Sequence, residues 1–203
     1  MPSQPQITVV NILAVSFTGS TWTNLSLGSH PDYFACGEID RLRKMGRGIC
    51  SLHGDDCPLW SRFDLHSDEN PFVQIARLTG KDVLFVNNSK RFRTELRHPA
   101  IRRAYVMVMR DGRGFVDSAM RRNPGRTVKH FTRQWVRETK RRYFWTVKDR
   151  QADVCRIRYE DLRADPEQGY RHICHTLGLD FHQDMLNFTH AEPHFIGGNL
   201  GPL

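Results

Sequence analysis

The chain has 203 residues, of which 39% are hydrophobic and 26% charged, as is typical of a soluble globular protein with one domain, here residues 1–203. Its net charge of +8 favours an anionic ligand, although nucleic acid or an acidic surface would suit that charge equally well. Residues 1–6 do not resemble a signal peptide, and the apolar run after them is shorter than the roughly 20 residues that span a membrane. We therefore expect a cytoplasmic protein without a membrane span.

Short apolar segments alternate with helix-compatible segments along the chain. Strands are predicted over residues 7–15, 33–36, 83–86, 104–109 and 154–158. Helices are predicted over residues 21–29, 38–45, 69–79, 113–122, 127–149, 166–177 and 182–188. Because short buried strands alternate with helices, we expect an α/β fold of three layers with a mostly parallel central sheet.

The first predicted strand ends in the turn Ser16-Phe17-Thr18-Gly19-Ser20-Thr21, which leads into a helix. A strand, a glycine turn and a helix start together direct backbone N–H groups and the helix dipole toward a bound phosphate. The side chains that would add hydroxyl donors are Thr18, Ser20, Thr21 and Thr23. The turn lacks the lysine of a Walker A loop, which argues against a kinase or NTPase. The alternative is an ordinary strand–helix turn in which Ser20 or Thr21 caps the helix.

Polar residues also follow the other predicted strands. They are Gly37-Glu38, Asn87-Asn88-Ser89-Lys90, Arg110-Asp111-Gly112-Arg113 and Tyr159-Glu160-Asp161-Leu162. In open α/β sheets, ligands bind at the carboxyl ends of the strands. Strand ends that together supply hydroxyls, a carboxylate, a lysine, two arginines and a tyrosine therefore predict a ligand site at this edge.

The five cysteines, at positions 36, 50, 57, 155 and 174, follow no disulfide framework. Cys50, His53 and Cys57 could form part of a zinc site, but no fourth ligand is evident from the spacing. We therefore expect free thiols and no bound metal.

Three motifs occur in order along the chain: residues 16–22 (SFTGSTW), Arg110 followed by Ser118 in RDGRGFVDS, and residues 158–162 (RYEDL). Together they resemble the sulfotransferases that use 3′-phosphoadenosine 5′-phosphosulfate (PAPS), from about residue 9 to residue 199. The resemblance implies a fold like that of P-loop nucleoside-triphosphate hydrolases, and a transfer reaction that needs no metal.

The same resemblance implies the residues that bind the nucleotide. The loop that would hold the 5′-phosphosulfate comprises Thr18, Gly19, Ser20, Thr21, Trp22 and Thr23. Arg110 and Ser118 would hold the 3′-phosphate, and Tyr159 would contact the adenine. Residues 194–199 resemble the start of a loop that closes over the cofactor, which adds Gly198 and Asn199. The alternatives are a surface ion pair of Arg110 with Asp111 or Asp117, and a packed aromatic role for Tyr159.

A further similarity concerns catalysis. His30-Pro31-Asp32 followed by Cys36-Gly37-Glu38 is similar to the tyrosylprotein sulfotransferases and to some bacterial members. This similarity implies Glu38 as the base and Lys90 as the cation that stabilises charge on the transferred group. Glu38 could instead begin a helix, Lys90 could belong to a solvated basic face, and His53 is the rival base.

The chain departs from the family at Phe17, where relatives commonly have lysine or arginine. Lys90 or Arg113 would then have to supply the missing charge, or sulfuryl transfer would be slow or absent. A protein that only binds nucleotide is therefore an alternative.

We expect an enzyme that moves a sulfuryl group from PAPS to the hydroxyl or amine of an acceptor and releases adenosine 3′,5′-bisphosphate. The acceptor would be a small molecule, sugar, lipid or peptide, and not nucleic acid. The alternatives are a kinase-like P-loop enzyme, which the missing Walker lysine disfavours, and a basic nucleic-acid-binding module, for which no recognition motif is present.

Overall fold

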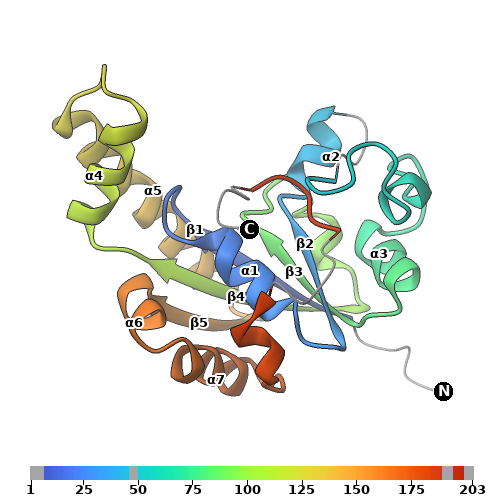
Figure 1. The fold of residues 1–203 in the computed structure, drawn as a ribbon. Helices are drawn as coiled ribbons and strands as arrows, with labels where there is room; N and C mark the ends of the chain where they lie inside the picture. The colour runs from blue at the N-terminus through green and yellow to red at the C-terminus, as the bar shows by residue number, and fades with distance from the viewer. Residues whose placement is uncertain (1–6, 46–49, 189–193, 199–203) are drawn as a thin grey trace.

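The computed structural model describes residues 7–45, 50–188 and 194–198, and its centre is a five-stranded sheet in the order β2-β3-β1-β4-β5 (Figure 1). The strands are β1 (Ile7–Ala14), β2 (Tyr33–Gly37), β3 (Val83–Asn87), β4 (Ile101–Met109) and β5 (Asp153–Arg158). Each neighbouring pair is parallel. The predicted α/β fold with a parallel central sheet is therefore confirmed.

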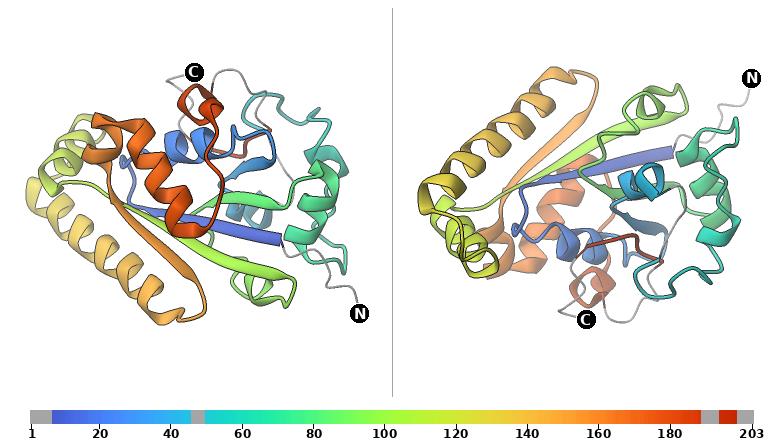
Figure 2. Two further views of the ribbon diagram at one scale, coloured as in Figure 1. Left: turned by 90° about the horizontal axis from the view of Figure 1, so that it is seen from below. Right: turned by 90° about the horizontal axis from the view of Figure 1, so that it is seen from above.

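Helices cover both faces of this sheet, which gives three layers (Figure 2). They are α1 (Ser20–Leu27), α2 (Asp40–Met45), α3 (Pro71–Thr79), α4 (Gly112–Arg122), α5 (Val128–Lys148), α6 (Tyr159–Ala164) and α7 (Pro166–Leu177). One face packs against α1, α6 and α7, and the other packs against α3 and α5. Among the described residues, no helix is both long and apolar enough to cross a membrane.

The central strand β1 shows why the sheet needs helices on both sides, because all eight of its residues are buried. Val10 and Ile12 pack into the core beneath α1 and α7, whereas Val9 and Leu13 belong to the clusters on the opposite face. A strand that is buried on both faces is typical of parallel sheets.

The predicted strands and longer helices are all present, with boundaries that shift by up to three residues. Two segments differ. The short helix α6 was not predicted after the fifth strand, and residues 182–188 contain only a 3-10 turn, Gln183–Leu186. Because the strands are parallel, their carboxyl ends meet at one edge of the sheet, where the predicted ligand site would lie.

Candidate nucleotide-binding site

A cavity of about 790 Å³ opens at the carboxyl edge of the sheet. It is lined by Ser16, Phe17, Gly19, Ser20, Thr21, Trp22, Leu25, Glu38, Asn88, Arg110, Ser118, Arg121, Arg122, Tyr159, Phe188 and Gly198. The structure thus brings together residues from all three motifs and from the end of β2. We call this space the edge cavity.

The turn between β1 and α1 depends on Gly19, which precedes the helix with a φ of +75°. A Cβ atom on Gly19 would lie 2.7 Å from the ring of Tyr159, so a larger residue would not fit there. Ser20 and Thr21 line the cavity. Thr18 and Thr23 are buried instead, and the Thr23 hydroxyl donates to the Gly19 carbonyl at 3.0 Å. Of the four predicted hydroxyls, two therefore face the edge cavity.

Arg110, directly after β4, is held in place by the residues around it. Its guanidinium donates to the Phe17 carbonyl and lies over the Tyr159 ring, 4.9 Å from the centroid. A Cβ atom on Gly114 would lie 3.1 Å from Arg110 Nε, so α4 can approach the Arg110 side chain closely because residue 114 has no side chain. Arg110 thus links the turn between β1 and α1 to the Tyr159 ring.

The carboxylates proposed as alternative partners of Arg110 have other partners. Asp111 forms an ion pair with Arg113 at 2.7 Å, and Asp117 forms one with Arg121 at 2.8 Å. The Arg113 side chain is 94% exposed, and it does not line the edge cavity in the described structure. It is thus poorly placed to replace the charge that Phe17 lacks.

Helix α4 brings two further arginines into the cavity that the sequence analysis missed. Arg121 and Arg122 follow Ser118 by three and four residues, so all three lie on the same side of the helix. The Arg122 guanidinium lies over the Phe17 ring, 5.8 Å from its centroid. The helical spacing from Ser118 was the signal that could have identified both.

Aromatic side chains form another wall of the cavity. Tyr159 is the first residue of α6 and meets the Trp22 ring edge-on, with centroids 6.5 Å apart. Trp22 in turn packs against buried Tyr170 at 5.9 Å. Tyr159 is therefore packed against a neighbour and also faces the cavity, where a planar base could stack on it.

Glu38 lies between β2 and α2, and its backbone N–H donates to the Ile196 carbonyl at 2.7 Å. Its carboxylate forms a 2.8 Å ion pair with Arg41 and remains 39% exposed. A Cβ atom on Gly197 would lie 2.9 Å from that carboxylate, and one on Gly198 would lie 2.9 Å from the Thr21 hydroxyl. Because Gly197 and Gly198 have no side chains, the segment 194–198 can pass between Glu38 and Thr21. Asn199 lies outside the described residues.

Lys90 does not line the edge cavity. It lines a second cavity of about 570 Å³, here called the basic cavity, together with Arg93, Arg141, Phe144, Trp145 and Lys148. Burial lowers the pKa of Lys90, and so does the positive charge of Arg142 and Arg141. His53, the rival base, also lies outside the edge cavity, beside His194.

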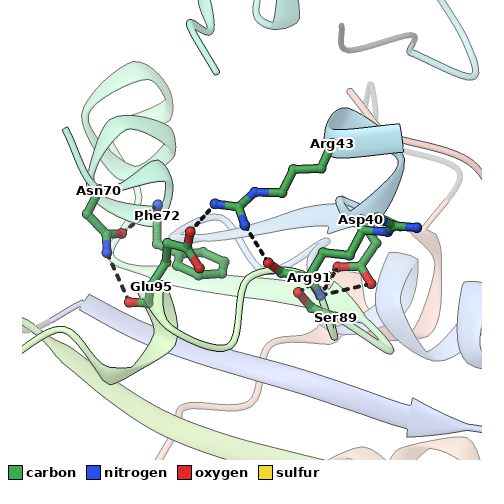
Figure 3. A network of polar contacts seen from close by, with 7 residues as sticks. All are labelled: Asp40, Arg43, Asn70, Phe72, Ser89, Arg91 and Glu95. Carbon is green, nitrogen blue, oxygen red and sulfur yellow. Dashed lines mark hydrogen bonds and ion pairs between the residues drawn. The ribbon is translucent and has the colours of Figure 1, made fainter. Parts of the chain in front are cut away.

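Asp40 fixes the loop that contains Ser89 and Arg91, with Lys90 between them; Figure 3 shows the contacts with Ser89 and Arg91. The Asp40 carboxylate accepts from the Ser89 hydroxyl at 3.2 Å, from Lys90 N at 2.9 Å and from Arg91 N at 3.0 Å. Arg43 extends the network by donating to the Arg91 carbonyl at 2.7 Å and by pairing with Glu95. The start of α2 therefore holds the segment after β3.

Asn88, which the sequence analysis did not single out, is a second fixed residue of this loop and lines the edge cavity. Its side-chain oxygen accepts from Ala14 N at 3.1 Å and from Arg142 Nε at 3.0 Å. Arg142 is buried on α5 and forms a 2.8 Å ion pair with Glu138. Asn88 therefore joins the end of β1 to α5.

Comparisons with known proteins support the family resemblance. A family model described as the sulfotransferase family matches residues 95–183, which contain Arg110, Ser118 and Tyr159. No curated protein sequence matches the chain significantly. The resemblance to sulfotransferases, first seen in the motifs, is confirmed in sequence over this segment.

Solved structures extend the likeness to nearly the whole chain. The sulfotransferase domain of the olefin synthase from Synechococcus PCC 7002 is 18% identical, with a TM-score of 0.59 over 95% of this chain and 81% of that chain. The sulfotransferase domain from the curacin biosynthetic pathway is 17% identical, with a TM-score of 0.58 over 96% and 81%. A sulfotransferase from Mycobacterium tuberculosis H37Rv is 14% identical, with a TM-score of 0.53 over 91% and 72%. The chain therefore has the sulfotransferase fold.

Proposed function

We propose that this chain is a sulfotransferase that moves a sulfuryl group from PAPS to an acceptor hydroxyl or amine and releases adenosine 3′,5′-bisphosphate. The observation that carries the proposal is that Arg110, Ser118 and the glycine turn all line the edge cavity. A turn at a helix start and a separate arginine suit a nucleotide with phosphate groups at two positions.

In this proposal the turn holds the 5′-phosphate through the backbone N–H groups at the start of α1 and the hydroxyls of Ser20 and Thr21. Arg110 and Ser118 hold the 3′-phosphate, and Tyr159 stacks on the adenine. Gly198 lies beside Thr21 and lines the cavity, so the segment 194–198 would border the nucleotide. Thr18 and Thr23 are buried, and they support the turn from inside the protein.

The reaction would be an in-line displacement at sulfur. The acceptor oxygen forms a bond to sulfur while Glu38 takes the acceptor's proton, and the bond from sulfur to the 5′-phosphate oxygen breaks. The electron pair of that bond remains on the leaving phosphate. A general base in this position typically contributes about 10²- to 10⁴-fold to the rate. Arg41 orients the Glu38 carboxylate through their ion pair.

The charge that develops on the leaving phosphate would be stabilised by the cations around the edge cavity and by the dipole of α1. Arg122 lies over Phe17 and supplies a cation near the position where relatives carry one on that residue. Lys90 would have to turn from the basic cavity toward Asn88 to reach the sulfuryl group. We propose that it does so when an acceptor is bound.

The test is calorimetric titration of adenosine 3′,5′-bisphosphate into the wild-type protein and into Arg110→Ala. A lost arginine–phosphate contact of about 1.5–3 kcal/mol corresponds to roughly 10- to 150-fold weaker binding. Arg126→Ala is the matched control, because Arg126 is exposed and does not line the edge cavity. Absence of binding at millimolar concentration would exclude the proposal.

Two alternative functions would give different results in calorimetric titrations. A kinase-like enzyme would bind ATP with magnesium and would show no preference for a 3′-phosphate. A nucleic-acid-binding module would bind DNA or RNA with a steep salt dependence. Turnover of PAPS against phenols, sugars, peptides and lipids would then identify the acceptor class.

A further inference from the structure

Four side chains that commonly bind metals meet outside the edge cavity. They are Cys50, His53, Cys57 and His194, and their ligand atoms all lie within 4.8 Å of one another. We propose that these four residues bind one Zn²⁺ ion as a structural site. Free thiols were expected from the sequence because no fourth ligand is evident near the cysteines, and His194 lies 137 residues after Cys57.

The distances between the ligand atoms suit tetrahedral zinc. Zinc–sulfur bonds of about 2.3 Å and zinc–nitrogen bonds of about 2.0–2.1 Å place neighbouring ligand atoms roughly 3.3–3.8 Å apart. Cys50 Sγ lies 3.4 Å from His53 Nδ1, and Cys57 Sγ lies 3.2 Å from His194 Nδ1. Small movements of the side chains would bring all four atoms to bonding distance around one ion.

Local structure holds the ligands in this arrangement. Cys50 N donates to the Gly54 carbonyl at 3.2 Å, and Gly54 N donates back to the Cys50 carbonyl at 2.9 Å, so the chain turns tightly at His53. Gly54 has a φ of +62°, which favours glycine. The Trp60 indole donates to the His194 carbonyl at 2.6 Å and so fixes the residue that comes from the far end of the chain.

The chemical type of the site follows from its donors and their burial. Two sulfurs and two imidazoles form a Cys2His2 set, which is typical of structural zinc. Both cysteines are buried and both histidines are half-buried, so four protein ligands would leave no open position for substrate. We therefore assign the metal a structural role, separate from sulfuryl transfer.

The metal would fasten the segment 194–198 to the body of the protein. Ile196 pairs with both Gly37 and Cys50, and its carbonyl accepts from Glu38 N. Gly198, two residues further on, lines the edge cavity. Zinc at His194 would therefore stabilise the segment that positions the candidate base and closes one side of the nucleotide site.

The first experiment measures zinc in the full chain, purified without chelator or metal-affinity resin, by elemental analysis. We expect one zinc per chain in the wild type, and zinc near the background level in Cys50→Ser and Cys57→Ser. Cys155→Ser is the matched control, because Cys155 is a buried cysteine on β5 outside the cluster. This variant should keep its zinc.

The second experiment does not depend on how well the cysteine variants fold. Metal-free wild-type protein is titrated with Co²⁺, and the thiolate-to-cobalt charge-transfer band and the visible bands of tetrahedral Co²⁺ are recorded. We expect saturation at one ion per chain, reversal by zinc, and an affinity at least ~10-fold lower in His194→Ala.

The proposal fails if wild-type protein takes up neither zinc nor cobalt, or if Cys57→Ser retains full occupancy. It also fails if mass spectrometry finds Cys50 and Cys57 joined as a disulfide in freshly purified protein. Metal binding does not require PAPS, so these outcomes are independent of the proposed sulfuryl transfer.

Discussion

Phe17 carries no charge itself, but two arginines are among its neighbours. Its φ is +63°, its carbonyl accepts from Arg110, and its ring packs on Phe115 with centroids 6.2 Å apart. Arg122 lies over the same ring. Arg122 thus places a guanidinium of α4 beside the turn.

We predict that Arg122→Ala weakens binding of adenosine 3′,5′-bisphosphate about 5- to 10-fold, because a cation would be lost beside the phosphate turn. Calorimetry at fixed, low salt measures this effect. Arg126→Ala serves as the control for overall charge. Equal losses in the two variants would assign the effect to net charge rather than to this position.

Glu38→Gln separates binding from chemistry. The amide keeps the size of the side chain and leaves the Glu38 backbone contact with Ile196 intact, so nucleotide affinity should change by less than about twofold. Turnover of PAPS should fall by about 10²- to 10⁴-fold, because glutamine cannot accept the proton. A variant that kept full turnover would remove Glu38 from the mechanism.

At the level of secondary structure, the turn between β1 and α1 depends on one glycine. Gly19 has both a left-handed conformation and a close aromatic neighbour. Gly80, at the end of α3, has a φ of +68°, but a Cβ atom added to it would meet no other atom within 4 Å. The two glycines therefore share the conformational requirement and differ in the steric one.

We predict that Gly19→Ala and Gly80→Ala each lose about 1–2 kcal/mol of unfolding free energy, because alanine is strained in the left-handed region. Only Gly19→Ala should also displace Tyr159 and lower nucleotide affinity. Urea denaturation and calorimetry on both variants measure the two effects. Unchanged affinity in Gly19→Ala would contradict the assigned role of the turn.

The elements were largely predictable from sequence because their patterns are local. Buried β-branched runs identified the strands, and the glycine after β1 identified the turn. The pattern did not reveal helix α6, which begins directly after β5 and has only six residues. Nor did it reveal that Thr18 and Thr23 are buried, since that depends on how the turn packs.

Across the whole molecule, long-range polar contacts join the layers. At the end of α5, the Asp149 carboxylate accepts from Arg103 at 3.0 Å and from the Tyr105 hydroxyl at 2.9 Å. Burial opposes ionisation of this carboxyl, but the hydrogen bonds from Arg103 and Tyr105 prevail and hold its pKa below the usual value. These contacts attach α5 to the sheet.

We predict that Asp149→Asn lowers the unfolding free energy by about 1–3 kcal/mol at neutral pH. Because the folded pKa is depressed, this stabilisation is complete above the unfolded pKa of about 3.9 and is lost as the pH falls through the folded pKa. In urea titrations the difference between wild type and variant should therefore begin to shrink below about pH 4 and should vanish once the pH is below the folded pKa. Asp117→Asn, at an exposed ion pair, is the control and should change stability by less than about 1 kcal/mol.

Contacts between distant segments explain what the sequence did not predict. Arg110, Ser118 and Tyr159 all line the edge cavity, and they could be singled out in sequence because each lies in a short recognisable motif. His194 was not connected with the Cys50 turn, because nothing local relates positions so far apart. Lys90 follows a strand as expected, but its side chain lines the basic cavity, since side-chain direction depends on the packing of its loop against α2 and α5.

Asp40 lies two residues after Glu38 and holds the loop of Lys90 through three hydrogen-bond donors. The base candidate and the cationic loop therefore share one anchor, and a displacement of either should be transmitted to the other. We therefore expect a substitution at Asp40 to disturb both segments at once.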